Sequence, residues 1–415
     1  MADRAAQVEA EQNARNRVVN LNSYNRFVRF FNRIRMSSFT NRLPIASVIT
    51  GLVLAMTAIG LLQSPRSKKS APELDASDGE FMRWAPAQGG VLVSSAVDST
   101  SVEGAAAKPV DPHLTMGSET CIKCHANEVK VWKATPHHRT FDELHRRPAA
   151  KEIASKLGVR SIKYDGRCVD CHYTQKVDLA SGNVHAIEGV SCESCHGSAK
   201  QWLDLHHDYG GEQVTRAMET PEHRQQRLAQ SVAAGMRNPV NVYLVAQSCL
   251  RCHTTADEEL VNVGGHPTGS LDFEFVSWSQ GTIRHNFIDS DGQSNDQNTR
   301  DRLRVMFVSG MIADLEASLR ATAEATQKAK FGVTAAKRAD RAAKRLLSVS
   351  QKVDSKQIEN VLMVYSGVTL KLNNREQLIQ AADAIADIGF RFAAETNGHV
   401  LEPLDAFIPP ANRWK

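Results

Sequence analysis

The sequence predicts a mainly α-helical protein with one N-terminal transmembrane helix, a middle domain of short helices and loops, and a C-terminal helical bundle. Three observations carry this prediction. An uncharged run spans residues 43–62, four identically spaced cysteine pairs lie between residues 121 and 253, and apolar residues recur every four positions after residue 300. A chain of 415 residues has room for two or three domains.

The uncharged run, LPIASVITGLVLAMTAIGLL, is long enough to cross the hydrocarbon core of a bilayer. A cleaved signal peptide is the alternative, but the preceding segment runs to 42 residues and no convincing A-x-A site follows. Seven arginines and no acidic residue lie between Asn13 and Arg42, so the positive-inside rule places the N-terminus in the cytoplasm. We therefore expect a single-pass anchor in the cytoplasmic (inner) membrane, with the rest of the chain in the periplasm.

The segments on either side of the run have different compositions. Residues 1–42 include YNRFVRFFNRIRM, where apolar residues at helical spacing alternate with arginines. Such a basic amphipathic segment either lies in the membrane headgroup region or docks on a partner subunit. Residues 63–112 are rich in Ser, Ala, Pro and Gly and show no sustained period, which predicts a flexible tether.

All eight cysteines belong to four C-x-x-C-H motifs, and none is left over. This motif is the attachment signature of c-type haem, in which both thiols bond the haem and the histidine binds the iron. A zinc ribbon needs no histidine after each pair, a thioredoxin motif is usually single, and disulfide frameworks belong to shorter chains. The sequence thus predicts four covalently bound haem c groups. In order along the chain, the first to fourth motifs are Cys121, Cys124 and His125; Cys168, Cys171 and His172; Cys192, Cys195 and His196; and Cys249, Cys252 and His253.

Eleven of the fifteen histidines lie outside these motifs, and this surplus favours ligation of each iron by two histidines. Methionine ligation is less attractive, because no methionine recurs at a fixed offset from the motifs. We assign residues 113–295 to the tetrahaem cytochrome c domain. From the residues alone, any one of the surplus histidines is either a distal ligand or a hydrogen-bonding surface residue.

Three segments in order carry a more specific resemblance. CIKCHANEVKVWKATPHHRTFDEL, CVDCH and GVSCESCHGSAKQWLDLHH resemble the tetrahaem cytochromes c that accept electrons from hydroxylamine oxidoreductase in ammonia oxidisers. The similarity covers residues 118–255, about a third of the chain. It includes neither the anchor, the tether nor the C-terminal helical region.

The resemblance implies closely packed, partly stacked haems, of which three have two histidine ligands and one has an open iron position. By position it implies His137 as the distal ligand of the third haem and His206 as that of the first. The second haem would be the open one. His138 and His207 are adjacent alternatives to these two ligands.

The fourth motif departs from the family pattern. The preceding segment, NPVNVYLVAQSC, contains no histidine from which a distal ligand could come. We expect His266 to replace it, with His285 as the second choice.

The region after Asn295 contains no cysteine and has the pattern of a bundle. Asn374 is a possible helix N-cap with Gln377 three residues on, and Asn397 and Gly398 form a stop signal. We expect three or four antiparallel helices within residues 296–399 and an extended tail at 400–415. The four-residue repeat consists of Leu303, Phe307, Met311, Leu315 and Leu319.

These features together predict an electron carrier rather than an enzyme, because iron with two histidine ligands has no vacant position for a substrate. At the open haem that the resemblance implies, we expect at most weak redox activity. The expected partners are a redox protein donor and acceptor, membrane lipid and, if a complex forms, other subunits. The net charge of +4 is too small to suggest a nucleic-acid partner. Three alternatives stay open: reduction of a small nitrogen species such as nitric oxide at an open haem, quinol oxidation, and electron entry into a larger membrane complex.

Overall fold

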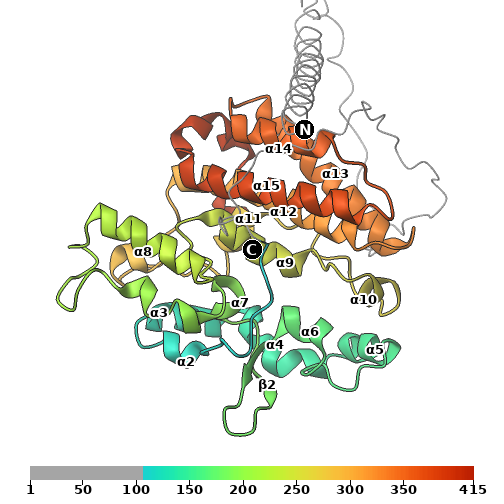
Figure 1. Cartoon of the computed structure of the whole chain (residues 1–415), viewed down its shortest axis with the longest axis horizontal. Coiled ribbons are helices and arrows are strands. Elements are labelled where there is room, and N and C mark those ends of the chain that lie inside the picture. Colours follow the sequence, from blue (N-terminus) through green and yellow to red (C-terminus); the bar gives the residue numbers. More distant parts are fainter. Residues whose placement is uncertain (1–105) are drawn as a thin grey trace, which may run out of the picture. The chain divides into compact units, whose positions relative to one another are not determined.

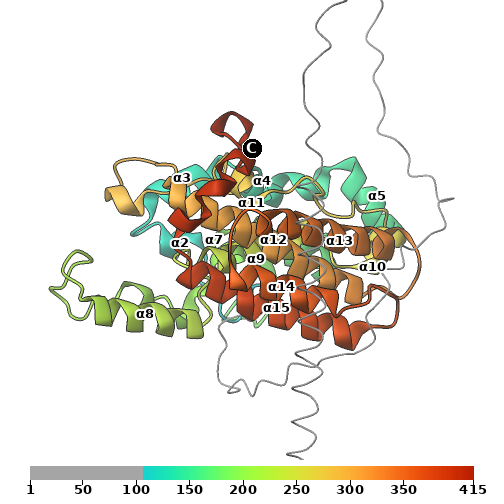
Figure 2. The same ribbon diagram turned by 90° about the horizontal axis from the view of Figure 1, so that it is seen from above.

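The computed structural model describes residues 106–415, shown from two directions in Figures 1 and 2. The prediction of a mainly α-helical protein is confirmed for these residues. The expected anchor at 43–62, the basic segment 1–42 and most of the tether lie outside them. Between residues 106 and 415, no helix is both long enough and apolar enough to cross a membrane.

Short helices joined by loops make up the region that carries the four motifs. Several begin at a residue whose side chain accepts a hydrogen bond from a backbone N–H of the first turn, as Thr135, Asp165 and Thr220 do. Four 3₁₀ turns lie between them, at Leu144–Arg146, Ala199–Gln201, Leu205–His207 and Ile288–Ser290. The helices are α2 (Ser118–Cys121), α3 (Ala126–Lys133), α4 (Pro136–Glu143), α5 (Pro148–Lys156), α6 (Gly166–His172), α7 (Cys192–His196), α8 (Pro221–Ala233), α9 (Val242–His253), α10 (Glu258–Asn262) and α11 (Phe275–Ser279).

One β-hairpin joins the second motif to the third. Strands β1 (Thr174–Val177) and β2 (Val184–Glu188) are antiparallel, with Thr174 opposite Glu188 and an irregular register at the next pair. The buried Thr174 hydroxyl donates to the carbonyl oxygen of Gly189 at 3.0 Å. The hairpin therefore fixes where the chain enters the third motif.

Four long helices form the C-terminal bundle: α12 (Arg300–Ala323), α13 (Lys330–Ser350), α14 (Lys356–Ser366) and α15 (Arg375–Glu395). Helix α12 packs against α13, α15 and α9, and it is buried on nearly every side. A helix that is largely apolar around its circumference is typical of a central core element. The predicted four-residue repeat lies on α12, and all five of its side chains are buried.

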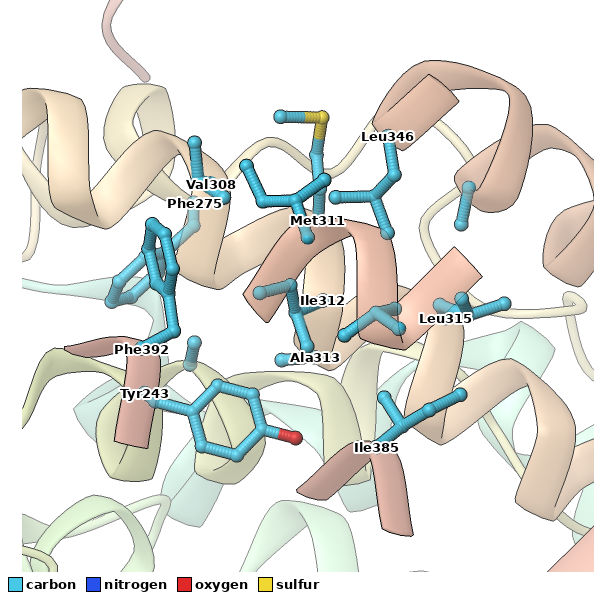
Figure 3. Packing of buried hydrophobic residues seen from close by; sticks show 14 of the residues in the cluster. Tyr243, Phe275, Val308, Met311, Ile312, Ala313, Leu315, Leu346, Ile385 and Phe392 are labelled. Atoms are coloured by element: carbon cyan, nitrogen blue, oxygen red, sulfur yellow. The ribbon is translucent and has the colours of Figure 1, made fainter. Parts of the chain in front are cut away.

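The helix of the fourth motif shares the core of this bundle. Tyr243 of α9 and Phe275 of α11 lie among the apolar side chains of α12 and α15, as Figure 3 shows. Gly389 on α15 permits this packing, because a Cβ atom there would lie 2.3 Å from the Tyr243 ring. From the sequence we placed a domain boundary at residue 295. In the structure, α9 carries the fourth motif and packs against the bundle, so it joins the two regions (Figure 1).

The C-terminal segment differs from the extended tail that we expected. Residues Gly398–Phe407 and Ala411–Arg413 form 3₁₀ helices. Leu401, Leu404 and Ile408 are buried against the bundle, and their spacing of three to four residues suits a helical turn rather than an extended strand.

The N-terminus of α15 also differs from the helix cap that the sequence predicted. Asn374 occupies the N-cap position, but its side chain makes no capping bond to the backbone. It donates instead to the side chain of Gln377 at 2.6 Å and to the carbonyl oxygen of Thr369 at 2.7 Å.

Candidate haem sites

Each C-x-x-C-H motif is associated with the end of a helix. Helices α6, α7 and α9 end at the histidine of the motif, and the first motif begins at the last residue of α2. Because positions i, i+3 and i+4 share one side of a helix, the two thiols and the imidazole of each motif within α6, α7 and α9 lie on a common face. This arrangement suits one planar group bonded through both thiols, with its metal ion beneath the imidazole.

Each motif histidine faces a second histidine from another part of the chain. An imidazole nitrogen binds a metal ion at about 2 Å, and the ring centre lies about 1 Å further, so imidazoles on opposite sides of one metal have centroids about 6 Å apart. All four pairs have this separation. The centroids are 6.3 Å apart for His125 and His206, 6.3 Å for His172 and His266, 6.2 Å for His196 and His285, and 6.3 Å for His253 and His137.

Nδ1 is hydrogen-bonded in several of these histidines. In His206, His266 and His285, Nδ1 pairs with a backbone carbonyl oxygen within three residues. In His253, Nδ1 lies 2.9 Å from the Ser270 hydroxyl oxygen. A proton held on Nδ1 leaves Nε2 free as the donor atom, as in most histidine metal sites.

Three of the four motif imidazoles, and one of the imidazoles that face them, lie in surroundings that keep them neutral. Burial lowers the pKa of His172, His196 and His253 to about 4. Burial also lowers the pKa of His137 below its ordinary value. Because a histidine must be unprotonated to bind a metal ion, these four side chains are in the binding form at neutral pH.

The pairing corrects three expectations from the sequence. His137, expected at the third motif, faces His253 of the fourth. His266, expected at the fourth motif, faces His172 of the second, which the resemblance implied to be open. The third motif is instead faced by His285, which sequence reasoning ranked only as a second choice for the fourth. His206 faces the first motif, the position that the resemblance implied.

Long-range contacts of the fourth motif and its following loop explain this pairing. Arg251, inside the fourth motif, donates from Nη1 to the carbonyl oxygen of Asp170, 81 residues away in the second motif. A Cβ atom on Gly264 would lie 3.2 Å from Ile153 of α5, so the loop before His266 packs against that helix. Local spacing in the sequence carries no information about either contact.

The third motif is held by a buried carboxylate. Glu193 is 2% exposed and accepts hydrogen bonds from the backbone N–H groups of Met116, Gly117 and Ala199. Gly189, just before the motif, has no room for a side chain, since its Cβ atom would lie 2.5 Å from the carbonyl oxygen of His137. The G-V-x-C-E-S-C-H pattern therefore reflects packing around the third motif.

Two tryptophans beside the histidine pairs have buried donors without a partner. Trp202 lies edge-on to His206 with centroids 5.2 Å apart, and Trp278 lies edge-on to His253 at 5.0 Å. Their indole N–H groups, and Nε of Arg284, are buried and have no hydrogen-bond partner. Because buried donors are normally satisfied, these groups fit a bound molecule with acceptor atoms, such as the haem propionates.

The remaining donor atoms do not fit zinc. Within residues 106–415, no three His, Cys, Asp or Glu side chains converge to hold a metal ion by themselves. All eight cysteines are free thiols. Paired histidines without further ligands fit a metal ion that a macrocycle already holds, so the residues fit haem c.

Contacts between motifs give their order in space. A hydrogen bond joins the thiols of Cys121 and Cys192 and raises the pKa of Cys192, so the first and third motifs touch. The thiols of Cys171 and Cys252 are joined in the same way, so the second and fourth motifs touch. Helix α7 packs against α9, which links the third motif to the fourth. The order is therefore first, third, fourth, second.

Comparisons with known proteins agree with this site. The model of the family described as cytochrome c554 and c-prime matches residues 120–197, which include the first three motifs. Cytochrome c-554 of Nitrosomonas europaea is 27% identical over 100 residues, which is 23% of this chain and 43% of that protein. The chain thus spans less than half the length of this curated relative. No solved structure matches the chain.

The fourth motif and three of the four facing histidines lie outside the matched segment. The anchor, the tether and the bundle lie outside it as well. Over the segment that carries its first three motifs, the chain is similar to the cytochrome c554 and c-prime family.

Proposed function

We propose that this chain is a tetrahaem c-type cytochrome that transfers electrons between redox proteins. One observation carries the proposal: every motif histidine faces a second histidine at 6.2–6.3 Å. Two imidazoles on each iron leave no position for a substrate, which suits a carrier. Bound haem c supplies a one-electron iron couple whose potential depends on axial ligands, hydrogen bonds and burial.

The contacts between motifs support a single route through the protein. With the order first, third, fourth, second, electrons enter at one end and pass two inner sites before they leave. Cys124 of the first motif is exposed, which favours that end as a contact for one redox partner. The second motif, flanked by α4, forms the other end.

The alternative of a nitric oxide reductase needs an open iron. The resemblance implied such a position at the second motif, and His266 lies there instead with its ring 6.3 Å from that of His172. We therefore rank the carrier above the enzyme. The quinol dehydrogenase is a less favoured alternative, since a tether of 50 residues does not hold a haem close to the bilayer. The electron-entry subunit of a larger membrane complex stays an alternative.

We also propose that residues 43–62 anchor the chain in the cytoplasmic membrane, with the haem sites in the periplasm. The uncharged run and the arginines before it support this proposal. The full-length chain should need detergent, while a version that starts at Ala71 and is exported by a cleavable signal should be soluble. Mature protein that begins after residue 62 in the native host would contradict the anchor.

Covalent loading tests the proposed cofactor. The purified protein should have the mass of the polypeptide plus four haems and should keep its colour in acid acetone. Replacing both Cys192 and Cys195 by Ala should lower the mass by one haem, which serves as the matched control. A colourless product that contains zinc would contradict the proposal.

A further inference from the structure

Two carboxylates lie inside the apolar core of the bundle. Asp314 and Glu316 are on α12, with exposed fractions of 9% and 3%. A buried carboxylate is destabilising unless it is paired with a cation and hydrogen-bonded. Both are paired in this way, and each is connected through an arginine to a motif histidine.

Glu316 joins α12 to the helix of the fourth motif. Its Oε2 accepts hydrogen bonds from the Tyr243 hydroxyl at 2.6 Å and from Nε2 of Gln247 at 2.7 Å, both on α9. Its Oε1 accepts from Nε of Arg320 at 2.9 Å. Figure 3 shows the Tyr243 ring among the apolar side chains of this core. A charged group therefore lies at the centre of an otherwise apolar interface.

The network continues from Glu316 to the third motif. The Gln247 side-chain oxygen accepts a hydrogen bond from Arg237, whose Nε donates to the carbonyl oxygen of Leu244 at 2.9 Å. The Arg237 backbone N–H donates to the carbonyl oxygen of His196 at 2.8 Å, and its own carbonyl oxygen lies 3.3 Å from Nδ1 of His196. The Arg237 backbone thus lies directly behind the ligand of the third haem, while its guanidinium lies against Leu244 and Gln247 of α9. Its guanidinium is buried, and burial lowers its pKa to about 10, so it is a cation at neutral pH.

Asp314 has the same relation to the fourth motif. Arg338 of α13 donates from Nε to Asp314 at 2.6 Å and from Nη1 to the carbonyl oxygen of His253 at 2.9 Å. The Arg338 side chain is 4% exposed. A second buried ion pair therefore lies behind the ligand of the fourth haem.

We propose that Glu316 and Asp314 are positioning residues that set the reduction potentials of the third and fourth haems through Arg237 and Arg338. Charges in the interior are screened less than charges in water, so they act strongly on a nearby iron. An arginine behind the ligand favours the reduced, less positive iron, and the carboxylate behind the arginine offsets this effect. The inference rests on the proposed function and gives the bundle a role in tuning the two inner haems.

Variants that remove opposite charges should shift the reduction potential in opposite directions. Glu316→Gln removes a negative charge with little change in shape, so the potential of the third haem should shift upward. Arg237→Gln removes the positive charge of the residue whose backbone contacts the ligand of the same haem, so that potential should shift downward. If the two substitutions acted only by disturbing the packing around the third haem, both would shift its potential in the same direction. Asp314→Asn should shift the potential of the fourth haem upward.

Asp405→Asn is the matched control. Asp405 pairs with buried Arg304 at 2.7 Å, and Arg304 lies on the same helix α12 but contacts no motif residue. All four potentials of this variant should equal those of the unmodified protein. The measurement is a redox titration of the fully loaded protein followed by optical and electron paramagnetic resonance spectra.

The outcomes separate this inference from the proposed function. Four low-spin haems with unshifted potentials in Glu316→Gln and Asp314→Asn would overturn the inference and leave the electron carrier in place. A high-spin haem in the unmodified protein would count against the carrier itself. If Glu316→Gln does not fold, Arg320→Met removes a cation from the same carboxylate and must lower the potential of the third haem. An upward or absent shift in that variant would overturn the inference.

Discussion

The bundle and the motif region bury different kinds of side chain. Between residues 300 and 395, leucine, isoleucine, alanine and phenylalanine side chains form one continuous core around α12. In the motif region, one buried apolar cluster consists of Ala154, Ile162, Val169 and Tyr173. The other interior groups there include histidines and cysteines. The chain supplies the core of the bundle by itself, whereas the proposed haem groups would complete the core of the motif region.

Helix α9 is where these two kinds of interior meet. Its Tyr243 and Leu250 are fully buried in the bundle core, and its last residue is the histidine of the fourth motif. The bundle is therefore part of the support of one haem site. This connection leads to predictions that separate the two regions.

Loss of haem should have the largest effect. Protein made without the haem-attachment machinery should lose amide-exchange protection across α2 to α7, because its interior would contain paired imidazoles and empty space. Residues 300–395 should stay protected, because their core is apolar. Hydrogen exchange with mass spectrometry compares the two regions, and a protected motif region without haem would contradict the comparison.

A cavity in the bundle should have the next largest effect. Leu315 is fully buried, so Leu315→Ala should lower the free energy of unfolding by about 2–5 kcal/mol. Leu179→Ala is the matched control, because Leu179 is 93% exposed and its loss should change that free energy by about 0.5 kcal/mol or less. Chemical denaturation followed by circular dichroism measures both, and equal effects would show that α12 is not the core.

A change of one facing histidine should alter a single haem. His266→Met should convert the second haem to histidine–methionine ligation and raise its potential, as methionine does in cytochromes c. His138→Met is the control, because His138 lies against Trp132 at 4.6 Å and faces no motif histidine. Redox titration detects the change. If only the His138 variant shifted, the pairing at the second motif would be wrong.

The smallest effect should come from an acidic residue at the edge of the motif region. Hydrogen bonds from Arg227 lower the pKa of Glu219 to about 2, and Arg227 also donates to the carbonyl oxygen of His206 at 2.7 Å. A lowered carboxyl pKa stabilises the fold above the ordinary value of 4.5, and this contribution is lost as the pH falls toward 2.

Glu219→Gln should therefore lower the free energy of unfolding by about 1–3 kcal/mol at neutral pH. The stability of this variant should also fall less steeply than that of the unmodified protein as the pH is lowered. Denaturation midpoints between pH 2 and pH 7 measure this effect. An unchanged acid limb would show that Glu219 contributes no pH-dependent stability.

The features that could be predicted from the sequence are those that depend on local spacing. Haem attachment needs two thiols and an imidazole on one helix face, so the four motifs are visible as short patterns. The buried stripe of α12 is visible for the same reason, since Leu303 and Leu319 belong to one periodic run.

Features that depend on contacts between distant segments could not be predicted. His253 and His137 meet because α9 packs between the bundle and the other motifs, and the sequence before His253 carries no sign of this. His285 lies in a loop without periodicity. Buried charges such as Glu316 are also invisible, because a glutamate in a helix is expected to face water. The turn at Leu401 and Leu404 did leave a signal, an apolar spacing of three residues.

The count of low-spin haems tests the central claim most directly. Electron paramagnetic resonance and magnetic circular dichroism of the fully loaded ferric protein should show four low-spin centres, each with two histidine ligands. None of the four should bind cyanide or nitric oxide rapidly. A high-spin centre that binds cyanide, above all one assigned to the second motif, would contradict the account, because the pair of His172 and His266 would then not hold an iron between its rings.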